Sequence, residues 1–157
     1  MHIKLSIVDT VLIMIYTGLR IGELLLIKNQ DIDIKNRTII GGIKTKAGKN
    51  RIIPINTKIL PLIQARISSG SNFLIVNKKG EQLSYQTYQK CFKKLMLKLN
   101  MQHTIHDCRH TFASLLSNAD ANKTAIAKII GHSNYETTEK IYTHKDIEEL
   151  KKAIDLI

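Results

Sequence analysis

The sequence has few cysteines and no long apolar run, and both absences narrow the class of protein. Two cysteines in a chain of 157 residues are too few for a disulfide framework, which favours a reducing cytoplasm. The longest apolar stretch, VLIMIY at residues 11–16, is much shorter than the roughly 20 residues that a bilayer-spanning helix needs. No charged-then-apolar leader with a cleavage site opens the chain. We therefore expect a cytoplasmic protein that is neither secreted nor inserted in a membrane.

Signatures of several cofactor-dependent enzymes are missing too. The sequence has no Walker phosphate loop, no Rossmann glycine pattern and no carboxylate cluster for Mg²⁺, so we expect no nucleotide cofactor and no metal. It also lacks internal repeats, low-complexity tracts and linkers rich in proline or serine. With 43% hydrophobic and 24% charged residues, the composition is that of a soluble globular protein. We expect residues 1–157 to form a single domain.

Acidic residues are scarce in the middle of the chain. The sequence has 24 Lys and Arg against 13 Asp and Glu, which gives a formal net charge of +11. Between residues 34 and 106 there are 14 basic residues and one acid, whereas six of the 13 acids lie from residue 136 onward. A one-sided basic region favours a polyanionic partner, most commonly nucleic acid. A merely soluble basic protein is the alternative.

Apolar periodicity predicts an α+β fold that is mostly α-helical, with one small antiparallel sheet. Residues 6–18 are apolar on nearly every side and end in Gly18, which predicts a buried helix with a glycine C-cap. Residues 21–29 predict a second helix. Apolar and polar residues then alternate at 31–41 and 50–55, which predicts two strands joined by a basic hairpin turn. After residues 73–76 the pattern is helical, with helices expected at 85–100, 106–119, 122–131, 134–144 and 146–157.

The helix expected at 85–100 has two different faces. Spacings of three and four predict a core face made of Tyr85, Tyr88, Phe92, Leu95 and Leu99. On another face three lysines repeat every four residues: Lys90, Lys94 and Lys98. This stripe is either solvated, as charge runs on helices usually are, or lies along DNA phosphates as a set of DNA-binding residues.

The stretch HTIHDCRH, residues 103–110, has two interpretations. Three histidines lie roughly on one helix face near a cysteine, as in a zinc hydrolase: His103, His106, His110 and Cys108. Against zinc, Asp107 is short for the general base of an H-E-x-x-H motif, and no further ligand follows at a known spacing. Alternatively, His106 and Arg109 lie one turn apart and together form a phosphate clamp. A helix with an exposed Arg and a half-buried His is the alternative to the clamp, and the pair alone is weak evidence.

Two further basic groups lie near turns. In TGLRIGEL, residues 17–24, Glu23 either forms an ordinary surface ion pair with Arg20 or orients it toward a ligand. The predicted hairpin turn concentrates four basic residues that can reach DNA or protonate a leaving oxygen: Lys44, Lys46, Lys49 and Arg51. A solvated turn is the alternative for this second group.

The segment GHSNYETTEKIYTH, residues 131–144, contains a tyrosine with mostly polar neighbours. Gly131 ends the preceding helix and places His132 at the surface, and Tyr142 has one apolar neighbour, Ile141, so we expect partial exposure. A free phenol with a pKa of about 10 is a poor nucleophile, but nearby arginines would stabilise the phenolate. Two arginines and a histidine also suit the negative charge that develops on a phosphodiester under attack. An aryl oxygen that attacks phosphorus forms a covalent phosphotyrosine ester.

The order of TGLRIGEL, KTKAGKNRIIPI, HDCRHTFAS and IIGHSNYETTEKIYTH resembles the catalytic domain of the tyrosine recombinases, the phage-integrase family. The similarity runs from about Asp9 to His144. It implies an integrase-like catalytic domain that cleaves and rejoins DNA strands through a covalent 3′-phosphotyrosyl intermediate. Such chemistry requires neither a metal nor a nucleotide.

The resemblance also implies roles for individual residues. Two arginines clamp the scissile phosphate, two histidines complete the pocket and an acid lies near the first arginine: Arg20, Arg109, His106, His132 and Glu23. Lys46 is the general acid that protonates the departing 5′ oxygen, and Tyr142 is the nucleophile that holds the 3′ phosphate. The family normally carries an N-terminal core-binding domain that closes around DNA, and we expect it to be absent from residues 1–157.

The partner implied is double-stranded DNA with a specific recombination site, bound by a homo-tetramer of the full-length protein at the bacterial nucleoid. A phage or another mobile genetic element is the implied source. Within the family, an apolar stripe such as that of residues 146–157 often docks on a neighbouring protomer, whereas folding onto its own core is the alternative. Three other functions stay open: strand cleavage like that of a type IB topoisomerase, non-catalytic DNA binding, and zinc-dependent hydrolysis.

Overall fold

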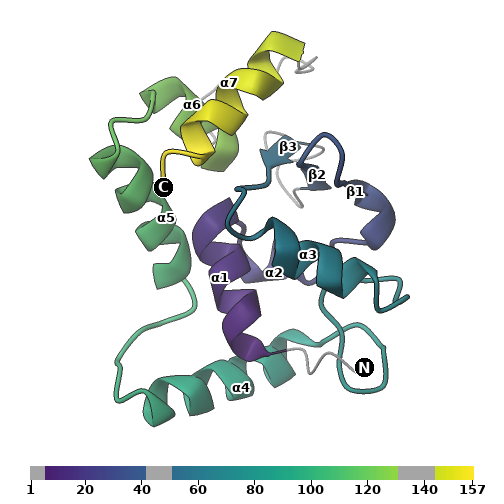
Figure 1. Cartoon of the computed structure of the whole chain (residues 1–157). Coiled ribbons are helices and arrows are strands. Elements are labelled where there is room, and N and C mark those ends of the chain that lie inside the picture. Colours follow the sequence, from purple (N-terminus) through teal and green to yellow (C-terminus); the bar gives the residue numbers. More distant parts are fainter. Residues whose placement is uncertain (1–5, 42–50, 131–143) are drawn as a thin grey trace.

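A computed structural model describes residues 6–41, 51–130 and 144–157. The elements follow in the order α1 (Ile7–Thr17), α2 (Ile21–Leu24), a 3-10 helix (Asn29–Asp31), β1 (Ile32–Asp33), β2 (Thr38–Gly41), β3 (Arg51–Pro54), α3 (Leu60–Ile67), α4 (Tyr85–Lys98), α5 (Asp107–Asn118), α6 (Lys123–Ile130) and α7 (His144–Ile154). Helix α1 lies at the centre, with α4 below it, α5 alongside and α3 on the other side (Figure 1). The predicted α+β fold, mostly helical with one small sheet, is confirmed. No helix in these ranges is long and apolar enough to cross a membrane.

Helix α1 begins and ends where the sequence predicts. At its start, the Ser6 hydroxyl accepts a hydrogen bond from the Val8 N–H at 3.1 Å. At its end, Gly18 has φ +66° and its N–H donates to the Met14 carbonyl at 2.9 Å. A Cβ at Gly18 would lie 2.5 Å from Cδ1 of Phe112 on α5. Glycine at this position therefore caps α1 and also lets α5 approach it closely.

Helix α2 is shorter than the helix expected at residues 21–29. It ends at Leu24, and the chain then turns so that its backbone pairs with a distant segment. The Leu74 N–H donates to the Ile27 carbonyl and the Asn29 N–H to the Asn72 carbonyl, each at 3.0 Å. Because these backbone groups bond outside the helix, the local apolar pattern does not continue as α-helix.

The three strands form the predicted antiparallel sheet, in the order β1-β2-β3. Ile39 of β2 is opposite Ile53 of β3, and neither has exposed surface. Gly41 is opposite Arg51 at the end of this pairing, next to residues 42–50, which lie outside the described ranges. The sheet therefore holds both ends of the predicted hairpin turn.

The later helices agree with the apolar pattern, with one correction on α4. Its core face consists of Tyr88, Phe92 and Met96, whereas Tyr85 is 43% exposed and Leu99 is 51% exposed. Both exposed residues lie at the ends of α4, beyond the part that packs against the core. Helix α3 was not predicted, and the helix expected at 134–144 falls almost wholly in 131–143, outside the described residues.

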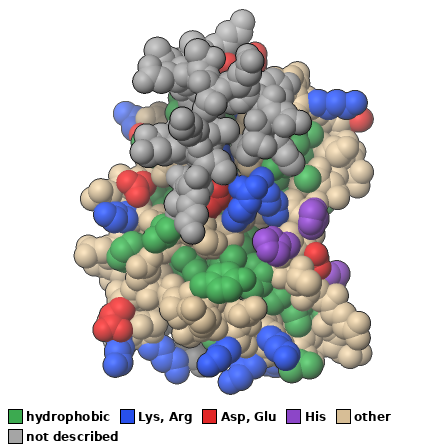
Figure 2. Space-filling view, turned by 180° about the vertical axis from the view of Figure 1, so that it is seen from behind, with side chains coloured by type: hydrophobic (Ala, Val, Ile, Leu, Met, Phe, Trp, Pro, Cys, Tyr) green, Lys and Arg blue, Asp and Glu red, His purple; other side chains and the backbone are tan. Residues whose placement is uncertain are grey.

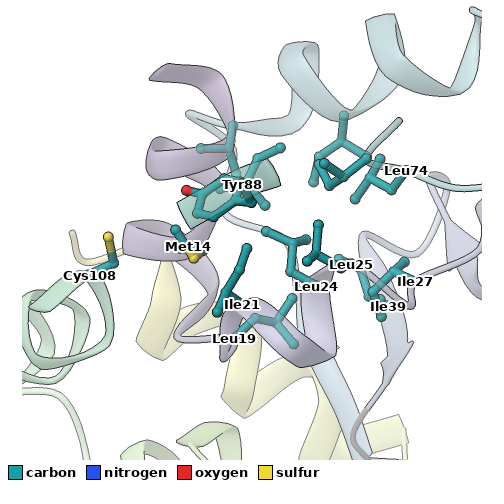
Figure 3. Packing of buried hydrophobic residues seen from close by; sticks show 14 of the residues in the cluster. Met14, Leu19, Ile21, Leu24, Leu25, Ile27, Ile39, Leu74, Tyr88 and Cys108 are labelled. Carbon is teal, nitrogen blue, oxygen red and sulfur yellow. The ribbon is translucent and has the colours of Figure 1, made fainter. Parts of the chain in front are cut away.

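Buried apolar residues form two clusters. The sheet cluster lies among α1, α2, the sheet, α3 and α4, and Figure 3 shows part of it around Met14, Leu24 and Tyr88. The helical cluster lies among α5, α6 and α7 and includes Phe112, Leu116, Ile129, Leu150 and Ile154. Because Leu150, Ile154 and Ile157 belong to this cluster, the apolar stripe of α7 folds onto its own core in this structure.

The two clusters meet along a seam where polar side chains bond across the boundary. The Asn56 amide donates to the carbonyls of Ile154 at 2.6 Å and Ile157 at 3.2 Å. Nearby, the Arg37 guanidinium pairs with the Asp155 carboxylate at 2.8 Å. The remaining seam residues are Gly18, Arg20, Glu23 and Arg51 on the sheet side, and Arg109, Ile129 and Ile130 on the helical side.

Candidate active site

Arg20 is the N-cap of α2 and lies on the sheet side of the seam. Its backbone N–H donates to Oε2 of Glu23 at 2.8 Å, and its Nη1 lies 3.6 Å from Oε1 of the same carboxylate. The Arg20 side chain is 50% exposed, whereas that of Glu23 is 5% exposed. The backbone of Arg20 is therefore anchored, while much of its guanidinium faces solvent and can bind an anion.

Glu23 is a buried carboxylate shared by two arginines. Arg51 donates to it with both terminal nitrogens, Nη1 to Oε1 at 2.8 Å and Nη2 to Oε2 at 3.0 Å. Burial raises the pKa of Glu23, but the hydrogen bonds and charges of Arg51 and Arg20 outweigh that effect and hold the pKa below its usual 4.5. Glu23 is therefore a permanent negative charge at neutral pH.

Arg109 reaches the same place from α5. Its Nη1 donates to the Gly18 carbonyl at 2.7 Å, and its Nη2 donates to the Ile130 carbonyl at 2.6 Å. Burial, followed by the charges of Arg20 and Arg51, lowers the pKa of Arg109 to about 10, so it stays charged at neutral pH. Three positive charges thus act at one site around a single carboxylate, Glu23. This excess of positive charge favours binding of an anion such as a phosphodiester.

His106 stands directly before the first turn of α5. Its side chain is exposed, and its carbonyl accepts the Arg109 N–H at 3.0 Å. The sequence motif therefore places His106 one turn from Arg109, as expected. Figure 2 shows histidine side chains beside a group of basic side chains on one face of the molecule.

The other potential zinc ligands of this stretch have different surroundings. His103 Nδ1 lies 3.3 Å from Oδ2 of Asp107, and Asp107 also accepts the Thr104 N–H at 2.9 Å. Burial raises the pKa of Cys108 to about 11, so its thiol is protonated at neutral pH. Within residues 6–41, 51–130 and 144–157, no three His, Cys, Asp or Glu side chains are grouped so that they could hold a metal ion.

Arg51 differs from its expected role as a DNA-contacting residue. Its side chain is 3% exposed, and besides its two bonds to Glu23 its Nε donates to the Ile129 carbonyl at 3.1 Å. Because all three guanidinium nitrogens of Arg51 donate hydrogen bonds within the protein and the side chain is buried, Arg51 cannot contact a DNA phosphate in this structure. The sequence does contain a signal for the burial of Arg51. Alternate residues of a strand share one face, so Arg51 lies on the same face of β3 as the fully buried Ile53.

The lysines on α4 are accessible, as the helical spacing predicts. Lys90, Lys94 and Lys98 are all exposed. Figure 2 shows basic side chains along the lower edge of the molecule, which is where Figure 1 places α4. This edge is separate from the basic group beside the histidines. A role of these lysines in DNA binding therefore stays a prediction.

The remaining predicted site residues lie outside the described residues. Lys44, Lys46 and Lys49 fall in 42–50, and His132 and Tyr142 fall in 131–143. The structure does describe what precedes and follows these segments in the sequence. Arg51 follows the first segment and is bound to Glu23, and Ile129 and Ile130, whose carbonyls accept from Arg51 and Arg109, precede the second.

Comparisons with known proteins give consistent results. The family model described as "Phage integrase family" matches residues 2–149. The tyrosine recombinase XerC of Actinobacillus pleuropneumoniae is 31% identical over 151 residues, which cover 91% of this chain and 48% of that protein. The chain thus spans about half the length of the curated relatives that it matches.

Two solved structures have a similar fold. The integrase of mycobacterium phage Brujita matches with a TM-score of 0.77 and 17% identity, over 99% of this chain and 53% of that one. The integrase of the Tn1549 transposon, solved in complex with a circular intermediate DNA, matches with a TM-score of 0.70 and 31% identity, over 80% of this chain and 50% of that one. The predicted integrase-like fold is therefore confirmed.

Proposed function

Since this chain belongs to the phage integrase family, we propose that it is the catalytic domain of a site-specific DNA recombinase or integrase. In this proposal it cleaves and rejoins DNA strands through a covalent 3′-phosphotyrosyl intermediate. One observation supports it above the others. Arg20 and Arg109, 89 positions apart in the sequence, are held at one seam with excess positive charge and with donors to spare.

The two arginines are proposed to bind the non-bridging oxygens of the scissile phosphate. A guanidinium has five N–H donors, and two of those of Arg109 bond to carbonyls, which fix its plane and leave three for a ligand. Arg20 adds a second, half-exposed guanidinium, whose backbone N–H is bonded to Glu23. Fixed donors stabilise the charge that develops on phosphorus oxygens more effectively than water can, because they need no reorientation.

Residues outside the described ranges are proposed to carry the covalent step. The phenolic oxygen of Tyr142 attacks phosphorus and forms the new P–O bond, while the bond to the 5′ oxygen breaks. Lys46 protonates that oxygen, and His106, whose side chain is exposed one turn from Arg109, is proposed to accept the phenolic proton. His132 completes the phosphate pocket. Rejoining is the reverse reaction, with a 5′ hydroxyl as nucleophile.

A covalent-capture experiment tests this function. The protein is incubated in EDTA with a library of nicked duplexes that carry a randomised central segment, and adducts resistant to denaturation are recovered and sequenced. We expect adducts with the wild type and with Tyr135→Phe, a matched tyrosine control from the same segment, and none with Tyr142→Phe. Adducts that persist with Tyr142→Phe would refute the nucleophile, and strand cleavage without an adduct, seen only in a parallel reaction that lacks EDTA, would favour a metal-dependent hydrolase.

The proposed partner is double-stranded DNA with a recombination site, bound in the cytoplasm at the nucleoid. We propose a homo-tetramer as the assembly that exchanges strands, and we propose that the exposed lysines of α4 contribute to DNA affinity. The duplex recovered by covalent capture allows both to be measured. Light scattering of the protein–DNA complex gives its stoichiometry, and replacing Lys90, Lys94 and Lys98 by Gln should lower the salt dependence of affinity.

A further inference from the structure

Arg51 carries no role in the proposed mechanism, yet it is the most fully bonded basic side chain of the seam. Its guanidinium makes three hydrogen bonds of 2.8–3.1 Å and is 3% exposed. Burial of an arginine is costly, and this one is compensated by a bidentate carboxylate and a carbonyl. The bonds of Arg51 link two places that the proposed function uses.

The first link runs through Glu23 to Arg20. The same carboxylate that accepts both Nη groups of Arg51 also accepts the backbone N–H of Arg20 and lies 3.6 Å from its guanidinium. With both oxygens bonded to Arg51, the carboxylate has a single orientation. Arg20 is therefore directed by a group that Arg51 holds in place.

The second link runs to the end of α6. Arg51 donates to the Ile129 carbonyl, while Arg109 donates to the carbonyl of the next residue, Ile130. Two arginines, one from β3 and one from α5, thus fix successive carbonyls at the end of α6. Because Arg109 also bonds to Gly18, the turn before Arg20 and the end of α6 are held in one network.

We propose that Arg51 is a positioning residue, which sets the orientation of Arg20 through Glu23 and fixes the end of α6 through Ile129. This role rests on the proposed function, since it is defined by the rate at which the phosphodiester is cleaved. Arg51 touches no phosphate itself. Its removal therefore slows cleavage by bound protein and leaves DNA affinity largely unchanged.

Arg66 provides a matched control. It is 2% exposed on α3, its Nη2 donates to the Ser6 carbonyl at 3.1 Å and to the Thr10 hydroxyl at 3.2 Å, and it lies 3.7 Å from Asp9. It is thus another buried, ion-paired arginine, with partners at the start of α1. A purely structural effect of replacing a buried arginine should appear equally in Arg51→Lys and Arg66→Lys.

The test measures adduct formation on the duplex recovered by covalent capture, with protein in excess over DNA. Under saturating protein the first-order rate constant reports on the bound complex, whereas the titration midpoint reports on affinity. We expect Arg51→Lys to lower this rate constant by about tenfold or more, because small misplacements of catalytic groups cost that much. Arg66→Lys should leave the rate constant within about twofold, and both variants should keep their DNA affinity within about twofold.

A double variant separates positioning from stability. Arg51→Met alone leaves Glu23 buried without its bidentate partner, so we expect a low thermal midpoint. Glu23→Gln combined with Arg51→Met removes both charges and should restore much of the midpoint. The rate constant should stay low in the double variant if positioning is the role.

The outcomes distinguish the two proposals. A rate constant of Arg51→Lys equal to that of Arg66→Lys, or a double variant that recovers both midpoint and rate, would overturn the positioning role alone. A wild-type chain that forms no Tyr142-dependent adduct would overturn the proposed function, and the positioning role with it.

Discussion

Ile39 and Ile53 face each other inside the sheet cluster without exposed surface, whereas Arg51, two residues before Ile53, is nearly as buried and bonds to a carboxylate and a carbonyl. The clusters are stabilised by apolar contacts, which are non-directional and tolerate small shifts. The seam is stabilised by hydrogen bonds, which depend on distance and angle. Since Arg20 and Arg109 lie on the seam, directional contacts define the geometry of the candidate site.

The largest effect is expected at Glu23, the buried carboxylate that binds Arg51 and lies 3.6 Å from the Arg20 guanidinium. Glu23→Gln should lower the free energy of unfolding by about 3 kcal/mol at neutral pH, because Arg51 then lacks its counter-charge. Urea unfolding measures the loss, with the exposed Glu81→Gln as a control that changes stability by less than about 0.5 kcal/mol. If both variants lost the same unfolding free energy, the seam carboxylate would be no more important for stability than a surface carboxylate.

The stability loss caused by Glu23→Gln should also depend on pH. The pKa of Glu23 in the folded protein is below 4.5, so the folded state binds its proton less readily than the unfolded chain. The stabilisation is therefore present above about pH 4.5 and is lost as the pH falls through the folded-state pKa. We expect the stability gap between wild type and Glu23→Gln to narrow in that acidic window, whereas a gap that is constant with pH would contradict this assignment.

Gly18 tests how closely the two clusters approach each other. Gly18→Ala adds a Cβ 2.5 Å from Phe112 at a positive φ, and should cost about 2–3 kcal/mol of unfolding free energy from strain and overpacking. Gly70 also has a positive φ, +76°, but has open space around it, so Gly70→Ala should cost about 1 kcal/mol from backbone strain alone. The difference between the two variants isolates the contact across the seam, and identical costs would show that Phe112 moves aside freely.

Asn56 tests the far end of the seam. Asn56→Ala removes the donor to the carbonyls of Ile154 and Ile157, and should cost about 1–2 kcal/mol. Asn36→Ala, which removes an exposed bond to Asp33, should cost less than about 0.5 kcal/mol. Thermal unfolding of both variants gives the comparison, and a larger loss in the Asn36 variant would reverse the ranking of buried over exposed bonds.

The smallest effect is expected at Asp155, whose carboxylate pairs with Arg37 at a partly exposed position. Asp155→Asn should lower the free energy of unfolding by about 0.5–1 kcal/mol at low ionic strength. Salt screens exposed ion pairs more than buried ones, so this difference should shrink in high salt while that of Glu23→Gln persists. Urea unfolding at two salt concentrations checks both statements.

The sequence predicts the local features of this fold well. Helix α1 with its Gly18 cap, the antiparallel sheet and helices α4 to α7 all have a periodicity that one segment displays by itself. Helix α3 was not predicted, although a proline in its first turn is a typical start signal. The helix expected at 21–29 ends at Leu24, because the backbone of residues 27–29 bonds to residues 72–74. No local sequence pattern predicts that pairing.

The candidate site was predictable in its residue types but not in its internal bonding. Motif order brings Arg20, His106 and Arg109 into consideration together, and the structure places Arg20 and Arg109 beside one carboxylate. The burial of Arg51 was not predicted, because its charge and its position next to a basic turn suggested solvent or DNA. Its partner Ile129 is 78 residues away, so only the three-dimensional fold reveals the bond.

The seam also has a consequence for the order of folding. Its bonds join residues that are 78 apart for Arg51 and Ile129, 91 for Arg109 and Gly18, 98 for Asn56 and Ile154, and 118 for Arg37 and Asp155. Contacts of such large sequence separation close long loops and form slowly relative to local helices. A nascent chain on the ribosome that has not yet emerged through α6 lacks the carbonyls of Ile129 and Ile130, which accept hydrogen bonds from Arg51 and Arg109. Assembly of the candidate site therefore belongs to the late steps of folding, after the sheet cluster can already exist.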